Sequence, residues 1–225
     1  MTKQKALKEI STKSKLKAQK LANERHLKWL EMIFGKKSIR SKANTNVETI
    51  ECDEFALIRQ ESDPKKFCHK KMRSRIRKGI PSQFRRVIWQ HLSGSFITKL
   101  DNPDLYGKII ASKKMSPVIF QIEKDINRTY QSGSFSREYE DRFSKSIFNV
   151  LNAFSLYCSE IGYCQGMNNI CALLLNIMTE EDAFWMLVSL ADNPLYSMRG
   201  CWKENMPSTK LRFYQLVRIL AFTIF

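Results

Sequence analysis

Apolar residues recur along much of this chain at the spacing of an α-helix. The clearest case is a stripe at i, i+4, i+7, i+8, i+11 and i+15, formed by Phe143, Ile147, Val150, Leu151, Phe154 and Cys158. Such a stripe predicts a helix with one buried face, ended by Gly162. No long run of residues alternates with period two, so the sequence predicts an all-α fold for the globular part.

A second helix is predicted from Pro81 to about residue 92. Proline suits the first position of a helix because its fixed φ is already helical and its missing N–H has no partner there. Phe84, Ile88 and His91 stand at i, i+4 and i+7, with Trp89 alongside. This spacing places His91 in the same apolar stripe as Phe84 and Ile88.

Three more helices are predicted towards the C-terminus. Residues 167–178 are mostly apolar and are expected to form a helix in the core. Thr179, with Asp182 three residues later, resembles a capping box at the start of the next helix. Ser208 is expected to cap the last helix, which is still apolar at Phe225.

The first third of the chain has a different character. Residues 3–34 are rich in Lys, Leu, Ala, Glu and Gln and lack Gly and Pro, which predicts a helix. Residues 36–63 show no periodicity and read as a linker with at most one short helix at residues 54–60. We therefore expect a basic helical arm (1–35), a linker ending in a basic flank (36–78) and a globular domain (79–225).

Positive charge is concentrated before the globular domain. The chain has 38 Lys+Arg against 22 Asp+Glu, a net of +16; residues 1–80 hold 22 basic and 9 acidic side chains (+13), leaving 16 and 13 (+3) for the rest. The basic flank, residues 65–78, carries eight Lys or Arg in fourteen residues. Such a flank can attract anionic membranes, although a run of charge is more often a solvated linker than a dedicated binding site. Nucleic-acid binding is disfavoured because Phe67 is its one aromatic residue.

Several classes of protein are excluded or disfavoured by what the sequence lacks. The N-terminus has no apolar run typical of a signal peptide, and no apolar stretch approaches the twenty residues of a membrane span, so we expect a cytoplasmic chain. Six cysteines without a C-x-x-C pair, beside three histidines, disfavour both zinc and a disulfide framework. Neither a P-loop nor a dinucleotide-binding glycine motif is present.

Two short segments are candidates for chemistry. In the segment from Ile122 to Arg128, Asp125 and Arg128 are neighbours at i, i+3 on a helix, so the carboxylate can brace the guanidinium. In the segment from Gly162 to Gly166, two glycines flank an aromatic residue and an amide at a junction between helices, where backbone can approach a partner. Taken singly, the first segment is better explained as a surface ion pair and the second as a plain turn between helices.

Together, and in this order, the motifs resemble the TBC domain of Rab GTPase-activating proteins. The resemblance begins at Gly79-Ile80-Pro81 with Arg85 and Trp89, following the family pattern G-I-P-x-x-L-R-x-x-x-W with Phe84 in place of Leu. It continues through Ile122-x-x-Asp125-x-x-Arg128-Thr129, Val150-Leu151 with Ala153, Gly162-Tyr163-Cys164-Gln165-Gly166-Met167-Asn168, and Ala183-Phe184-Trp185. Five matched segments in register over residues 79–225 make the resemblance specific.

The resemblance implies an activator of a Rab-family small GTPase, working in vesicle trafficking and intracellular protein transport. It makes Arg128 an arginine finger and Gln165 a glutamine finger, both supplied to the GTPase in trans. Asp125 would then orient Arg128, Tyr163 would fix the loop bearing Gln165, and Arg85 and Trp89 would have supporting roles. Ile122, Gly162 and Gly166 belong to the same two motifs. The resemblance implies no cofactor of the chain's own, since GTP and Mg²⁺ arrive with the GTPase.

The sequence also departs from the family pattern. The family's domain continues through further helices beyond the point where this sequence ends, so we expect an incomplete domain, either a fragment or an isoform. Its last helix would then carry an uncovered apolar face formed by Phe213, Leu216, Val217, Leu220, Phe222, Ile224 and Phe225. This departure keeps open a catalytically impaired module that binds or scaffolds a GTPase. The third alternative is a binder of anionic membranes, peripheral on endomembranes, or of nucleic acid, through the basic flank.

Overall fold

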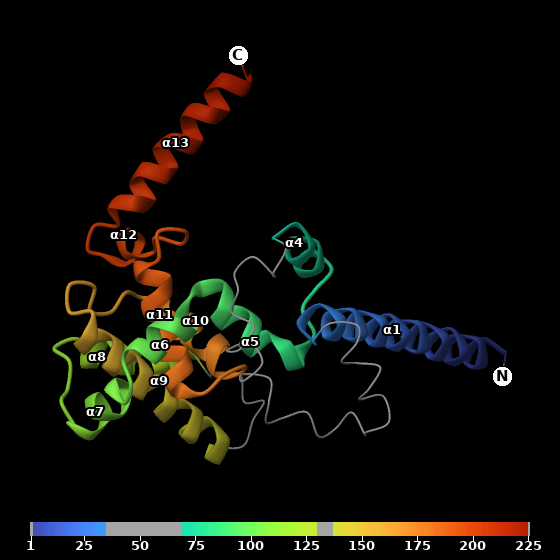
Figure 1. Cartoon of the computed structure of the whole chain (residues 1–225), viewed down its shortest axis with the longest axis horizontal. Helices are drawn as coiled ribbons and strands as arrows, with labels where there is room; N and C mark the ends of the chain where they lie inside the picture. The colour runs from blue at the N-terminus through green and yellow to red at the C-terminus, as the bar shows by residue number, and fades with distance from the viewer. Residues whose placement is uncertain (1, 35–68, 130–136, 225) are drawn as a thin grey trace. The chain divides into compact units, whose positions relative to one another are not determined.

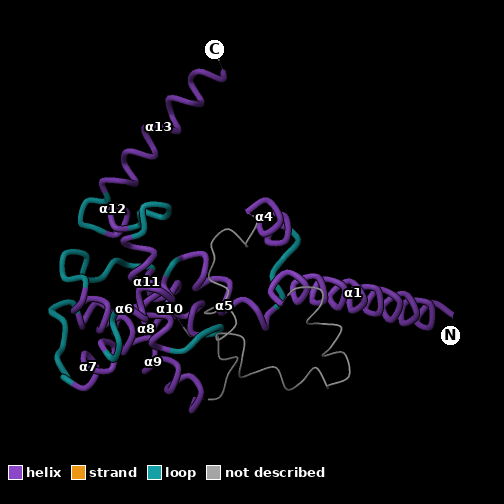
Figure 2. The backbone as a smooth tube through the Cα atoms, in the orientation of Figure 1, coloured by secondary structure: helices purple, strands orange, loops and turns teal. Residues whose placement is uncertain are grey.

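A computed structural model of the chain describes residues 2–34, 69–129 and 137–224. These residues form α-helices joined by turns, with no strand among them (Figures 1 and 2), which confirms the predicted all-α fold. The helices are α1 (Thr2–Phe34), α4 (His69–Arg77), α5 (Ser82–Ser93), α6 (Ser95–Asp101), α7 (Leu105–Ala111), α8 (Ile119–Thr129), α9 (Arg137–Tyr157), α10 (Met167–Leu175), α11 (Glu180–Asp192), α12 (Arg199–Trp202) and α13 (Pro207–Ile224). The chain divides into two compact units, Met1–Val87 and Ile88–Phe225.

The first unit holds α1, α4 and the beginning of α5. Trp29 of α1 is fully buried, and its indole Nε1 donates to the backbone carbonyl of Gly79 at 3.2 Å. His26 stacks on Phe84 with ring centroids 5.0 Å apart, and burial lowers the pKa of His26. These contacts hold the turn after α4 against the last part of α1. The short helix predicted at residues 54–60 lies outside the described residues.

The core of the second unit is built around α9 and α11. Ala183–Val188 of α11 are buried at every position, which is the pattern of a helix surrounded by protein. Helix α9 packs against α7, α8, α10 and α11, and α11 packs also against α6; Figure 1 shows these helices gathered together. The stripe on α9 is buried as predicted, from Ile147 to Cys158. The two helices that carry the candidate site, α8 and α10, are thus both fixed to α9.

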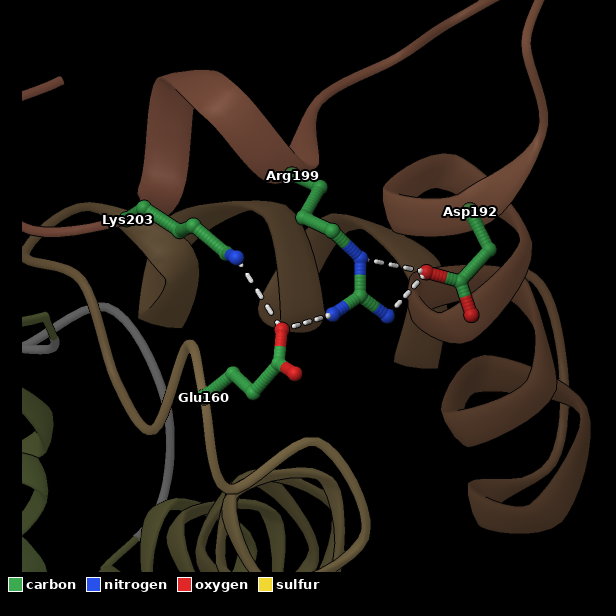
Figure 3. A network of polar contacts seen from close by, with 4 residues as sticks. All are labelled: Glu160, Asp192, Arg199 and Lys203. Atoms are coloured by element: carbon green, nitrogen blue, oxygen red, sulfur yellow. Dashed lines mark hydrogen bonds and ion pairs between the residues drawn. The ribbon is translucent and has the colours of Figure 1, made fainter. Parts of the chain in front are cut away.

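An ion-pair network joins three parts of the second unit (Figure 3). The Arg199 guanidinium contacts the carboxylate of Asp192, at the end of α11, and donates to Oε2 of Glu160, in the α9–α10 connection, at 3.0 Å. Lys203 contacts the same Glu160 oxygen at 3.0 Å. Lys203 and Arg199 lower the pKa of Glu160, so its carboxylate is charged at neutral pH. The network therefore links α12 to the connection that carries Gln165.

Most predicted helix boundaries agree with the structure, with some exceptions. Thr179 caps α11 as predicted, accepting from the Asp182 backbone N–H at 3.4 Å. The prediction that Ser208 caps the last helix was wrong, because α13 begins one residue earlier, at Pro207, whose fixed φ suits the first helical turn. The prediction that His91 belongs to the apolar stripe of this helix was also wrong, because His91 is exposed and Gln90 is buried.

Two further predicted boundaries were approximate. Helix α9 ends at Tyr157, and Gly162, with φ +61°, closes the turn that follows. Helix α10 ends at Leu175, three residues before the predicted end of the core helix at residue 178.

Helix α13 carries large exposed apolar side chains. Those described are Leu211, Phe213, Tyr214 and Leu216, each at least half exposed. Phe213 and Leu216 belong to the predicted apolar face; its other five residues lie outside the described side chains. Within the described ranges, none of the helices combines the length and apolarity that crossing a bilayer requires.

Candidate functional site

The two segments singled out in the sequence meet at one pocket in the second unit. The pocket has a volume of about 280 Å³ and takes its lining from the end of α8, the α9–α10 connection and the start of α10. Its lining residues are Asp125, Arg128, Gln165, Gly166, Asn168 and Asn169. The predicted pair Arg128 and Gln165, 37 positions apart (165 − 128), therefore borders a single concavity.

Helix α8 positions its two charged residues by its buried face. Ile122 is fully buried and Ile126 is 5% exposed, so the helix is fixed to the core one turn before the site. Asp125 is also buried, whereas the Arg128 side chain is 57% exposed. Nη1 of Arg128 lies 4.0 Å from Oδ1 of Asp125, in the predicted i, i+3 arrangement. The guanidinium is thus beside a fixed carboxylate but open to solvent.

Tyr163 connects the α9–α10 connection to α8. Its hydroxyl donates to Oδ2 of Asp125 at 2.9 Å and lies 3.3 Å from Oδ1 of Asn168. Burial raises the pKa of Tyr163, and the hydrogen bond and charge of Asp125 raise it further. The hydroxyl consequently stays protonated at physiological pH and remains a donor to the Asp125 carboxylate. This contact spans 38 positions and holds the connection against α8.

Asn168 is a third buried member of the network that sequence reasoning did not assign as a site residue. It is 6% exposed, and its Nδ2 donates to the backbone carbonyl of Asp125 at 3.3 Å. The bond ties the first turn of α10 to α8. An amide inside a mostly apolar helix was the available signal, because a buried polar side chain generally has a hydrogen-bond partner.

The backbone around Gln165 depends on two glycines with positive φ. Gly162 has φ +61° and Gly166, at the N-cap of α10, has φ +97°. Residues other than glycine rarely adopt such positive φ angles, which explains the glycine pair in the motif. Gln165, between them in the sequence, is exposed at the pocket. Its carboxamide can both donate and accept hydrogen bonds.

The remaining predicted site residues lie elsewhere. Arg85 belongs to the first unit, where its Nε donates to the carbonyl of Ile80 at 3.2 Å. Trp89 is half-buried and packs against the core of the second unit. Neither lines the pocket, so their supporting roles stay predictions. Within the described part of the chain, no group of His, Cys, Asp and Glu side chains is arranged to hold a metal ion.

The arrangement offers a cation and a carboxamide on one pocket. An exposed guanidinium can contact phosphate oxygens in a bidentate manner, and a carboxamide can orient a water molecule. The site can therefore stabilise negative charge and orient a bound water molecule.

Comparison with known proteins gives a consistent result. The model of the Rab-GTPase-TBC domain family (RabGAP-TBC) matches residues 82–224. The human "Ecotropic viral integration site 5 protein homolog" is 34% identical over 179 residues, covering 78% of this chain and 21% of that protein. "Rab GTPase-activating protein eat-17" of Caenorhabditis elegans is 38% identical over 141 residues, covering 63% and 15%. "TBC1 domain family member whacked" of Drosophila melanogaster is 36% identical over 124 residues, covering 55% and 34%.

A solved structure shares the fold. The crystal structure of the Chlamydomonas flagellar RabGAP TBC domain aligns with a TM-score of 0.50 at 22% sequence identity, covering 78% of this chain and 54% of that chain. The chain spans 15% to 34% of the length of the three curated relatives named above. Because the family model matches more than half of the sequence, the chain belongs to the RabGAP-TBC family.

Proposed function

We propose that this chain is a GTPase-activating protein for a Rab-family small GTPase, with Arg128 and Gln165 inserted into the active site of the partner. The observation that carries the proposal is the placement of both side chains on one pocket, above a buried network of Tyr163, Asp125 and Asn168. Similarity to proteins such as the Rab GTPase-activating protein eat-17 supports the choice of partner.

The chemistry of GTP hydrolysis explains why these two residue types suit the task. Hydrolysis develops negative charge on the phosphoryl oxygens, and a guanidinium placed there stabilises the transition state. The attacking water must also be oriented, which a carboxamide achieves by donating one hydrogen bond and accepting another. GTP and Mg²⁺ belong to the partner, and this chain supplies Arg128 and Gln165.

On this proposal the remaining residues of the site act by positioning. Asp125 and Tyr163 are buried and hydrogen-bonded to each other, so they hold the end of α8 and the α9–α10 connection at a fixed separation. Because these residues are fixed before the partner binds, forming the complex costs less conformational entropy. The chain would work in vesicle trafficking, in the cytoplasm or at the endomembranes to which its partner is anchored.

The test is single-turnover GTP hydrolysis by a panel of purified Rab proteins, with and without the chain. Arg128→Ala should lower the stimulated rate by roughly 10³-fold or more, the scale of an arginine finger. Arg128→Lys should restore little, because an ammonium group lacks the planar fork. Gln165→Ala should also lower the rate while leaving the thermal unfolding midpoint unchanged.

Two variants serve as matched controls. Arg142→Ala and Gln121→Ala remove an exposed side chain of the same type outside the pocket, on α9 and α8 respectively. Both should keep the wild-type stimulated rate. If Arg128→Ala is as active as Arg142→Ala, the assignment of the arginine finger is wrong. If the wild-type chain binds a GTPase but stimulates none of the panel, the chain is a GTPase-binding module without turnover.

A further inference from the structure

The first unit contains a pocket with a strongly basic lining, separate from the site described above. It has a volume of about 190 Å³ and lies between α1 and the end of α4. Its lining residues are Leu21, Glu24, Arg25, Lys28 and Trp29 from α1, and Arg75 and Lys78 from α4 and the turn after it. All seven belong to the same compact unit.

The charges around this pocket are unbalanced. Four cationic side chains face one carboxylate, that of Glu24, which gives a net charge of 4 − 1 = +3. None of the four cations forms an ion pair with another residue in the part of the chain that the structure describes. Like charges gathered around a concavity repel one another and raise the local positive potential, which an anionic ligand would relieve.

The wall of the pocket is fixed by buried contacts. Trp29 is fully buried and donates to the carbonyl of Gly79, which anchors the turn that carries Lys78. Gly79 has φ +98°, and a Cβ added there would lie 3.2 Å from Nη1 of Arg25. Because residue 79 is a glycine, the backbone can adopt this positive φ, and the Arg25 guanidinium has room beside it. Arg25 itself is half-buried, which limits the positions its side chain can take.

Ordinary helix electrostatics explain only part of this cluster. Cations near the C-terminus of a helix interact favourably with its dipole, and Arg75 lies in the last turn of α4. Arg25 and Lys28 have no such role, because they lie a turn or more before the end of α1 at Phe34. A solvated basic face would not need to be concave or to combine two segments that are 46 positions apart (75 − 29).

We infer that this pocket between α1 and α4 binds a ligand with two or more phosphate groups, of the kind carried by phosphorylated inositol headgroups. A phosphate monoester carries about −1.5 to −2 charges at pH 7, so two such groups match the net charge of the pocket. Arg25 and Arg75 provide planar forks suited to phosphate oxygens, and Lys28 and Lys78 provide point charges. The inference does not depend on the proposed GTPase-activating function.

Two probes distinguish a lipid from a soluble source of the phosphates. The first is vesicles of phosphatidylcholine containing phosphatidylinositol 4,5-bisphosphate, compared with vesicles of equal surface charge made with phosphatidylserine. The second is soluble inositol 1,4,5-trisphosphate, titrated into the full chain by calorimetry. A lipid ligand predicts preference for the inositide vesicles; binding of the trisphosphate without that preference assigns the pocket to a soluble phosphorylated ligand.

A charge-matched pair of double variants tests the site itself. Arg25→Gln with Lys28→Gln removes two charges from the pocket, and Lys13→Gln with Lys17→Gln removes two exposed charges from α1 outside it. The pocket variant should lose at least about tenfold in affinity for the inositol phosphate probes, and the control less than about twofold. Thermal unfolding followed by circular dichroism checks that both variants fold.

The outcomes that overturn the inference are equally definite. Equal losses in the two double variants would mean that diffuse charge, and not the pocket, attracts the probes. Failure of the wild-type chain to bind either inositol phosphate probe would remove the site.

Discussion

Replacing Tyr163 with phenylalanine removes a single oxygen from beneath the candidate site. The ring stays in its packed position, but Asp125 loses the hydroxyl that donates to Oδ2 at 2.9 Å. Asn168 loses the polar neighbour 3.3 Å from its Oδ1. The substitution thus weakens the tie between α8 and the α9–α10 connection without adding charge or volume.

The magnitude follows from burial. Tyr163 is 7% exposed and Asp125 is 8% exposed, so water cannot easily replace the lost donor. A hydrogen bond to a buried charged group contributes about 1.5–3 kcal/mol, and Tyr163→Phe should lower the free energy of unfolding by that amount. If the bond also positions Arg128 and Gln165, the stimulated hydrolysis rate should fall by roughly 10- to 100-fold in the folded protein.

Tyr106 provides a matched control in the same unit. It is 8% exposed, and its hydroxyl donates to Oε2 of Glu180 at 2.9 Å, outside the pocket. Burial and the Glu180 carboxylate raise the pKa of Tyr106, as burial and Asp125 do for Tyr163. Tyr106→Phe should therefore cost similar stability and leave the stimulated rate of the folded protein unchanged. Asn149 also donates to Oε2 of Glu180, at 3.2 Å, so this carboxylate keeps one donor in Tyr106→Phe.

Urea unfolding gives the stability of both variants, and single-turnover hydrolysis at a temperature where both are folded gives the activity. The reasoning requires the two measurements to separate: both variants lose stability, and Tyr163→Phe alone loses activity. Equal hydrolysis rates for the two variants would show that the Tyr163–Asp125 bond is structural and does not position the site.

Two further predictions concern the elements around the site. Arg199→Ala removes two exposed ion pairs, with Glu160 and with Asp192, and should lower the free energy of unfolding by less than about 1 kcal/mol for each. This loss should become smaller when urea unfolding is repeated at high salt. A loss that does not depend on salt would contradict its electrostatic origin. Gly166→Ala should lower the free energy of unfolding by about 1–2 kcal/mol because φ at this position is +97°; no atom lies close to an added Cβ, so crowding does not contribute. Gly107→Ala in α7, where an added Cβ is also uncrowded, should raise the free energy of unfolding by about 0.5–1 kcal/mol. The same sign of change at both glycines would refute the argument from φ.

Helical periodicity predicted the fold well where the buried face is wide. The stripe from Ile147 to Cys158 is buried as expected, because α9 is covered by four other helices and every apolar position on that face has a neighbour. The prediction failed near the end of α5. His91 stands seven residues after Phe84 and three after Ile88, which places it in the stripe by spacing, yet His91 is exposed and Gln90 is buried. Burial there depends on which neighbours cover the helix in the folded chain, and spacing does not contain that information.

The candidate site was predictable as two local pieces. The i, i+3 relation of Asp125 and Arg128 follows from helix geometry, and the glycines of the connection follow from the need for positive φ. The bond from Tyr163 to Asp125 could not be found this way, since a contact across 38 positions depends on how α8, α9 and α10 pack. Asn168 was missed for the same reason: its partner is a backbone carbonyl of another helix.

Under the proposed function, Arg128 has to leave Asp125 and contact a phosphate group of the GTPase-bound nucleotide, and its loose pairing with Asp125 allows this. With Nη1 at 4.0 Å from Asp125 and 57% of its side chain exposed, the guanidinium has an ion pair of the kind that contributes at most about 1 kcal/mol. Asp125 does not depend on that pair, because Tyr163 donates to its other carboxylate oxygen. An incoming phosphate could therefore engage Arg128 at little cost, while α8 and the α9–α10 connection stay fixed. A tight, buried Asp125–Arg128 pair would have opposed this exchange by several kcal/mol.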